Sequence, residues 1–305
     1  MKHLTLRTPT FLYLEESFKE WLSILGYSGS TVYRLPVLIR EFMHHLENKG
    51  IQQTEGIDEE QVKLFMDYSR QRKKLRTGGG LSNSHLNKQL QAIKTFGRYL
   101  RETGRHSFPL DLLQYKTPRS IKAILTPEEI KLLYRAAAPT PYGLRDKVML
   151  GVYYGCGLRR NEGLQLDVND VLLERGMLYV RKGKNFTERY VPLNPEVIKD
   201  MAWYLHQVRP QLLHTDKPDT AFFISQRGGR IDGLSMCLRL KKLQTDSSDN
   251  ELQQKEIGLH TLRHSIATHL LQGGMRLERI AQFLGHKSIE STQIYTHLAH
   301  EPLIG

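Results

Sequence analysis

The sequence has few cysteines and no long apolar segment. Its two cysteines, Cys156 and Cys237, belong to no CxxC motif and to no Cys/His pattern with zinc spacing. This excludes a disulfide scaffold and indicates a reducing compartment. The N-terminal stretch MKHLTLRTPTF lacks the apolar segment of a secretory signal, and no apolar run approaches the roughly 20 residues of a membrane helix. We therefore expect a cytoplasmic protein that does not enter a membrane.

Acidic side chains are also scarce relative to basic ones. Lysine and arginine number 44 against 32 aspartates and glutamates, which gives a formal net charge of +12 at pH 7. A surplus of this size favours a polyanionic partner, because lysines and arginines that neutralise phosphates release counterions. Nucleic acid is therefore our first hypothesis for the partner, and a basic surface without a partner is the alternative.

The length of 305 residues is typical of two domains. Residues 11–104 contain four amphipathic segments with helical spacing, separated by glycines, which predicts a small all-α domain. Two prolines and several basic residues then interrupt the periodicity. We predict a helical domain at 1–107, a linker at 108–124 and a second domain at 125–305.

The second domain mixes helices with short strands. Thr126-Pro127-Glu128-Glu129 predicts a helix start, with threonine as the N-cap. The stretch VLLERGMLYVRKGKNFTERYVPL reads as short strands with turns at Arg175-Gly176 and near Asn185-Phe186. FFISQRGGR resembles a strand that enters a turn, and residues 244–254 resemble a polar loop. The predicted fold is mainly α with a small antiparallel β-sheet, in which a four-helix domain precedes an α+β domain.

The segment LHTLRHSIATHLL carries three histidines and an arginine. His260 and His264 share a helix face, but Thr261 stands where a metalloprotease needs glutamate, and the cation of Arg263 repels a metal. We therefore expect no metal. His260 and Arg263 are three residues apart and suit a phosphate, for which arginine offers a forked pair of donors. For His264 and His269 we favour a structural role.

Three other segments carry candidate residues, each with an ordinary alternative. Arg159 follows a Gly-x-Gly turn, which presents the next side chain, although it could pair with a surface acid. Lys182 and Lys184 occupy a predicted hairpin tip, where a lysine can protonate a leaving oxygen or be merely solvated. His286 follows a Leu-Gly helix end, and Tyr295 lies nine positions later, where a tyrosine is usually half-buried packing.

Taken in order, the motifs GLR, GK…ERYVPL, HTLRH, LGH and IYTH resemble the tyrosine recombinases of the phage integrase family, above all the Xer-type and transposon-borne members. Each motif is weak alone, but five in the right order with the right local spacing are specific. The resemblance covers about residues 124–300, and the four-helix domain resembles the core-binding domain of the family. Arg160-Asn161 departs from the aliphatic-Ser pair that is common before Glu162.

The resemblance implies which residues are catalytic. Glu162 matches the acid that usually follows the first arginine, and Lys182 stays open as an alternative to Lys184. The six catalytic residues implied are Arg159, Lys184, His260, Arg263, His286 and the nucleophile Tyr295.

The resemblance also implies the reaction. Tyr295 would attack a DNA phosphodiester and form a 3′-phosphotyrosyl link, so that strands are cut and rejoined without ATP, a metal or another cofactor. The partners implied are double-stranded DNA and three further copies of the chain, in a tetramer on DNA. Two alternatives remain open at this point, a type IB topoisomerase-like DNA relaxase and a DNA-binding regulator without catalysis.

Overall fold

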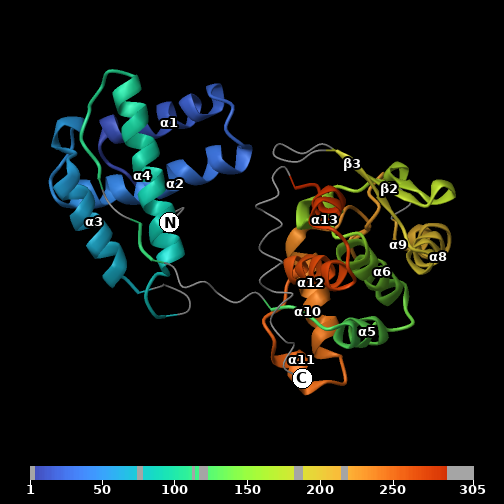
Figure 1. The fold of residues 1–305 in the computed structure, drawn as a ribbon. Helices are drawn as coiled ribbons and strands as arrows, with labels where there is room; N and C mark the ends of the chain where they lie inside the picture. Colours follow the sequence, from blue (N-terminus) through green and yellow to red (C-terminus); the bar gives the residue numbers. More distant parts are fainter. Residues whose placement is uncertain are drawn as a thin grey trace. The chain divides into compact units, whose positions relative to one another are not determined.

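The computed structural model describes residues 4–73, 78–111, 114–116, 123–181, 188–213 and 219–286. The chain divides into two compact units, Met1–Ser120 and Ile121–Gly305 (Figure 1). Each unit has a hydrophobic core of its own. Among the residues within these ranges, no helix is long and apolar enough to span a membrane.

The first unit contains the four helices that the periodicity predicts. They are α1 (Pro9–Ile24), α2 (Gly29–Asn48), α3 (Glu59–Gln71) and α4 (Asn83–Glu102), with a 3-10 turn at Thr54–Gly56. The side chains of Ser28, Asp58 and Ser82 cap three of these helices by accepting a backbone N–H three residues later. Phenylalanines from all four helices meet in the core.

The segment predicted as a linker begins on the first unit. Phe108, Leu110 and Tyr115 pack against the core of that unit. The backbone of Tyr115 exchanges two hydrogen bonds with the side chain of Asn87 on α4, at 2.7 and 2.8 Å. Part of the segment 108–124 is thus attached to the helical unit, and the exact limits of the linker stay a prediction.

The second unit is mainly helical. Its helices are α5 (Pro127–Arg135), α6 (Pro141–Leu150), α7 (Arg160–Leu164), α8 (Pro195–Trp203), α9 (Arg209–Leu212), α10 (Gly233–Thr245), α11 (Asn250–Gln254), α12 (Leu259–Gln272) and α13 (Leu277–Leu284). Thr126 starts α5 with the predicted capping box. A π-helical turn at Gly151–Gly155 extends α6, another at Tyr204–Val208 joins α8 to α9, and 3-10 turns occur at Val168–Asp170 and Leu173–Arg175.

The strands form the small antiparallel sheet that the sequence predicts. It consists of β1 (Val171–Leu172), β2 (Met177–Val180) and β3 (Arg189–Pro192), in the order β1-β2-β3. The predicted turn at Arg175-Gly176 is present, with Gly176 in the left-handed region at φ +60°. Val180 pairs with Arg189 across β2 and β3. The predicted turn near Asn185-Phe186 lies outside the described residues.

Two local predictions were wrong. In FFISQRGGR, Ile224 and Arg230 pair in an isolated bridge across the predicted turn, and the residues before the turn form no strand. Phe222, Phe223 and Ile224 are consecutive and all buried, so their side chains do not alternate between a buried and an exposed face as those of a half-buried strand do.

The second wrong prediction is the loop at residues 244–254. Its two ends are helical, because α10 continues to Thr245 and α11 occupies Asn250–Gln254. Gln244 is fully buried and donates hydrogen bonds from Nε2 to the carbonyls of Leu252 and Lys255, at 2.5 and 2.7 Å. A buried amide with partners in the following residues therefore orders a segment that looks polar and mobile in the sequence.

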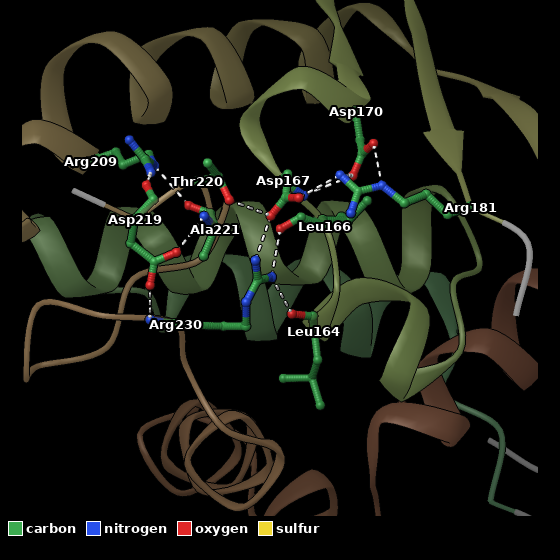
Figure 2. A network of polar contacts seen from close by, with 10 residues as sticks. All are labelled: Leu164, Leu166, Asp167, Asp170, Arg181, Arg209, Asp219, Thr220, Ala221 and Arg230. Carbon is green, nitrogen blue, oxygen red and sulfur yellow. Dashed lines mark hydrogen bonds and ion pairs between the residues drawn. The ribbon is translucent and has the colours of Figure 1, made fainter. Parts of the chain in front are cut away.

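A network of charged side chains ties the sheet to the segment after α9 (Figure 2). We call Asp167, Asp170, Arg181 and Arg230 the Asp167 cluster. Arg181, at the end of β2, contacts Asp167 at 2.5 Å and Asp170 at 2.9 Å. Arg230 contacts Asp167 at 2.5 Å and donates to the carbonyls of Leu164 and Leu166. Two cations thus balance two carboxylates.

Candidate active site

The C-terminal end of α13 is the centre around which the candidate residues gather. The helix ends at Gly285, which adopts φ +66°, and the N–H of His286 donates to the carbonyl of Ala281 at 2.9 Å. The last carbonyls of a helix have no partner within the helix, and they carry its negative dipole end. This end is therefore suited to receive cationic donors from elsewhere in the chain.

Two of the predicted arginines donate to these carbonyls. Arg159, the N-cap residue of α7, donates to the carbonyls of Leu284 at 3.3 Å and Gly285 at 3.3–3.4 Å. Arg263, buried on α12, donates from Nη2 to Leu284 at 2.8 Å and from Nη1 to Gly157 at 2.6 Å. The carbonyl of Leu284 thus joins two side chains that are more than a hundred positions apart in the sequence.

Glu162 lies between the guanidinium groups. Its Oε1 accepts from Arg159 Nη1 at 2.9 Å, and its Oε2 accepts from the backbone N–H of Arg159 at 2.8 Å. Arg189, on β3, donates to both carboxylate oxygens at 3.2 and 3.0 Å. Arg263 Nη1 lies 3.8 Å from Oε2. We call Glu162, Arg159, Arg189 and Arg263 the Glu162 cluster.

The Glu162 cluster is electrostatically unbalanced. Burial alone would raise the pKa of Glu162, but the hydrogen bonds and charges of Arg189 and Arg159 outweigh burial and lower the pKa below its ordinary value. Glu162 is therefore ionised at neutral pH. Three permanent cations surround this single carboxylate, so the cluster keeps a net positive charge that favours an anion nearby.

His286 stands beside this cluster and is half-buried. Burial, followed by the charges of Arg263, Arg159 and Arg189, lowers the pKa of His286 to about 4. The imidazole is therefore neutral at physiological pH, with one nitrogen as a hydrogen-bond donor and the other as an acceptor. Next to an anion, such a group contributes a hydrogen bond without changing the charge of the site.

The histidines of the segment LHTLRHSIATHLL lie on α12. His260 is in the first turn, three residues before Arg263, and its side chain is exposed. An i, i+3 pair shares one face of a helix, so His260 and Arg263 project from the same face of α12. His269 lies further along, and its Nδ1 is 2.9 Å from the hydroxyl of Tyr154. That contact agrees with the structural role expected for His269.

A sequence model of the phage integrase family matches residues 123–301. The matched range spans Arg159, Glu162, Arg189, Arg263 and His286. This chain belongs to the phage integrase family. It is a tyrosine-type site-specific recombinase, an enzyme class that acts on DNA.

Known recombinases resemble the chain over nearly its whole length. The tyrosine recombinase XerC 2 of Ralstonia nicotianae is 32% identical over 298 residues, which cover 95% of this chain and 83% of that relative. A structure of the XerH site-specific recombinase bound to palindromic difH substrate matches with 21% identity and a TM-score of 0.70, covering 95% of this chain and 82% of that one. The Tn1549 transposon integrase in complex with transposon right end DNA matches with 17% identity and a TM-score of 0.71, covering 92% and 94%. These two structures show the shared fold.

The structure describes part of the predicted recombinase site. The structure brings together Arg159, Arg263 and His286, and it places His260 on the same helix as Arg263. Lys182, Lys184 and Tyr295 lie outside the described residues. Within the described ranges, no three His, Cys, Asp or Glu side chains are grouped so that they could hold a metal ion.

Arg189 is the site residue whose contacts sequence reasoning missed. In the sequence, Arg189 stands out only as part of the motif GK…ERYVPL. A usable signal was its place in a short strand with period-two alternation, in which Val191 faces the core and Arg189 therefore faces the same side. A charged residue on the buried side of a strand requires a partner.

Proposed function

We propose that Tyr295 of this recombinase attacks the scissile phosphorus of duplex DNA, forms a 3′-phosphotyrosyl bond and releases a 5′-hydroxyl. Rejoining is the reverse attack by a 5′-hydroxyl, so the bond energy is conserved and no ATP is needed. The observation that carries the proposal is the convergence of Arg159, Arg263 and His286 at the end of α13, with a surplus of positive charge.

The roles of the residues follow from where charge develops. Negative charge grows on the nonbridging oxygens in the transition state, and Arg159 and Arg263 hold these oxygens with preorganised donors. Neutral His286 adds a hydrogen bond. His260 takes the proton of the Tyr295 hydroxyl, whose ordinary pKa is about 10. Lys184, or Lys182 in its place, protonates the departing 5′-oxygen.

The proposed partners are double-stranded DNA and further copies of the chain. The net charge of +12 fits a duplex, and the two structural neighbours named above are complexes, one with palindromic difH substrate and one with transposon right end DNA. Exchange of strands between two duplexes requires four protomers. The arginines supply the positive charge that balances the negative charge of the transition state, so we assign no metal or cofactor. The cytoplasmic location stays a prediction.

Trapping on a nicked suicide duplex tests the proposal. In this substrate the strand fragment released by cleavage diffuses away, so the covalent complex accumulates and migrates as a shifted band on a denaturing gel. We expect the native chain to form this complex and Tyr295→Phe to bind the same duplex without forming it, because the variant lacks the attacking oxygen. The reaction is expected to proceed equally in EDTA. An undiminished adduct with the Phe variant would contradict the assignment of Tyr295.

A further inference from the structure

Arg189 connects three elements of the second unit. Its Nε donates to the carbonyl of Phe283 at the end of α13, at 2.9 Å. Its Nη1 and Nη2 each donate to one oxygen of Glu162, in the two-pronged arrangement that fixes a carboxylate most firmly. The side chain is only 7% exposed. Arg189 therefore joins β3 to α7 and to the helix end that precedes His286.

Arg189 does not itself face a substrate. All three guanidinium nitrogens donate to groups of the protein, and the side chain is buried. Its influence on a phosphate must pass through the groups that it holds. The group it holds most firmly is Glu162, which in turn binds Arg159 by both its side chain and its backbone N–H.

The charged and titratable groups that face Glu162 come from several elements. Arg159 approaches from the start of α7, Arg189 from β3 and Arg263 from α12. The negative charge of Glu162 also acts on His286 and Tyr153, whose pKa values it raises. Among the groups that favour the ionised form, Arg189 contributes most. Without Arg189, burial would disfavour the ionised form of Glu162, because the cation that stabilises this form most would be missing. The contact between Glu162 and Arg159 would then lose its fixed geometry.

Resting on the phosphodiester chemistry proposed above, we propose that Arg189 is a positioning residue that holds the Glu162 carboxylate so that Glu162 sets the Arg159 guanidinium against the scissile phosphate. The contacts form one chain from β3 through Glu162 to Arg159, with N–O distances of 2.9 to 3.2 Å. A displaced Arg159 would no longer meet the nonbridging oxygen that it neutralises. A displacement of about 1 Å at such a site can lower a rate about 100-fold.

The test compares cleavage of two nicked suicide duplexes by the full-length chain. One carries the normal scissile phosphodiester, and the other carries a methylphosphonate, which lacks the negative charge that Arg159 neutralises. The variants are Arg189→Met, which removes the cation, and Arg189→Lys, which keeps a cation but loses the two-pronged contact. Arg209→Met is the matched control, because Arg209 is also buried and donates to the backbone carbonyls of Ala221 and Asp219, away from the site.

We expect Arg189→Met to slow single-turnover cleavage of the phosphodiester about 100-fold relative to the native chain. The cleavage rate of Arg189→Lys should lie between that of the native chain and that of Arg189→Met. On the methylphosphonate the defect of Arg189→Met should shrink several-fold, because the charge that Arg159 serves is absent. Cleavage of the phosphodiester by Arg189→Met should also recover as pH rises, since loss of Arg189 raises the pKa of Glu162 and higher pH restores the carboxylate. Arg209→Met should show the same relative rate on both duplexes.

Equal defects of Arg189→Met on both duplexes, with no recovery at high pH, would overturn the positioning role and leave only a structural one. Arg189→Lys allows the defects on the two duplexes to be compared in a variant that keeps the positive charge. DNA binding by each variant is measured separately by gel shift. If the native chain forms no covalent complex on either duplex, the proposed function fails instead, so the two failures are distinguishable.

Discussion

The second unit contains two arginine–carboxylate clusters of four residues that differ in charge and burial. The Glu162 cluster places three arginines around one carboxylate, and its Arg189–Glu162 pair is buried. The Asp167 cluster balances two arginines with two carboxylates (Figure 2). Its Arg181 and Arg230 side chains are 47% and 36% exposed. Ion pairs that are balanced and exposed to solvent connect segments but contribute little to the free energy of unfolding. An unbalanced buried cluster is stable only if further hydrogen-bond acceptors satisfy its surplus cations.

Those further acceptors are the carbonyls at the end of α13. Phe283, Leu284 and Gly285 each accept from an arginine of the Glu162 cluster. The negative end of the helix dipole partly offsets the surplus cations while leaving the cluster positive overall. The Glu162 cluster is therefore able to attract a phosphate, whereas the Asp167 cluster is already neutral. Three predictions test this difference between the two clusters.

The largest difference in cleavage rate is expected between variants that lack one arginine of the Glu162 cluster or one arginine of the Asp167 cluster. Arg263→Met should slow formation of the covalent complex about 100- to 1000-fold, as loss of one preorganised donor does at other charged transition states. Arg230→Met should leave the rate within about threefold of the native chain, since an exposed, balanced pair contributes less than about 1 kcal/mol. Single-turnover trapping on a nicked duplex measures both. Comparable losses for the two variants would show that the clusters do not differ in function.

A smaller difference is expected between two glycines in the left-handed region. Gly176→Ala has only the conformational cost, about 1 to 2 kcal/mol, because its new Cβ would lie at an ordinary 3.5 Å from Ile198. Gly285→Ala adds a collision, since its Cβ would lie 2.7 Å from Arg189 Nη1. We expect Gly285→Ala to be the less stable variant in urea unfolding and the only one of the two with slowed cleavage. Equal cleavage rates would show that the end of α13 tolerates a displaced Arg189.

The smallest expected effect is a difference in pH dependence. His286 in the folded chain has a pKa of about 4, against an ordinary value of 6.5. Between these values the unfolded chain binds more protons, so stability falls as pH drops from 6.5 towards 4. His286→Gln should flatten this part of the curve.

The Asp167 cluster should respond in a different pH range. Burial opposes ionisation of Asp167, but Arg230 and Arg181 outweigh it and lower the pKa below 3.8. The stability from this cluster is therefore present above pH 3.8 and lost only as pH falls below that value. Asp167→Asn should flatten the curve only in this lower range. Urea unfolding as a function of pH distinguishes the variants, and overlapping curves would mean that the two clusters titrate together.

The fold could be predicted largely from local patterns. Ser28 and Ser82 as N-caps and the capping box at Thr126 act within a few residues of their own positions, so they are visible in sequence. The segment around Gln244 could not be predicted in this way. Its order depends on where one buried amide finds backbone carbonyls, and the polar composition of the following residues argued for a loop.

The candidate site likewise has features that the sequence predicts and features that it does not. The motif residues Arg159, His260, Arg263 and His286 can be recognised in the sequence, because each stands in a short pattern with its own local geometry. That Arg159, Arg189 and Arg263 share Glu162 and the end of α13 becomes evident only from the packing of the folded chain. The physical reason is that every residue offers a carbonyl as an acceptor, so a buried arginine's partner is selected by packing and not by residue type.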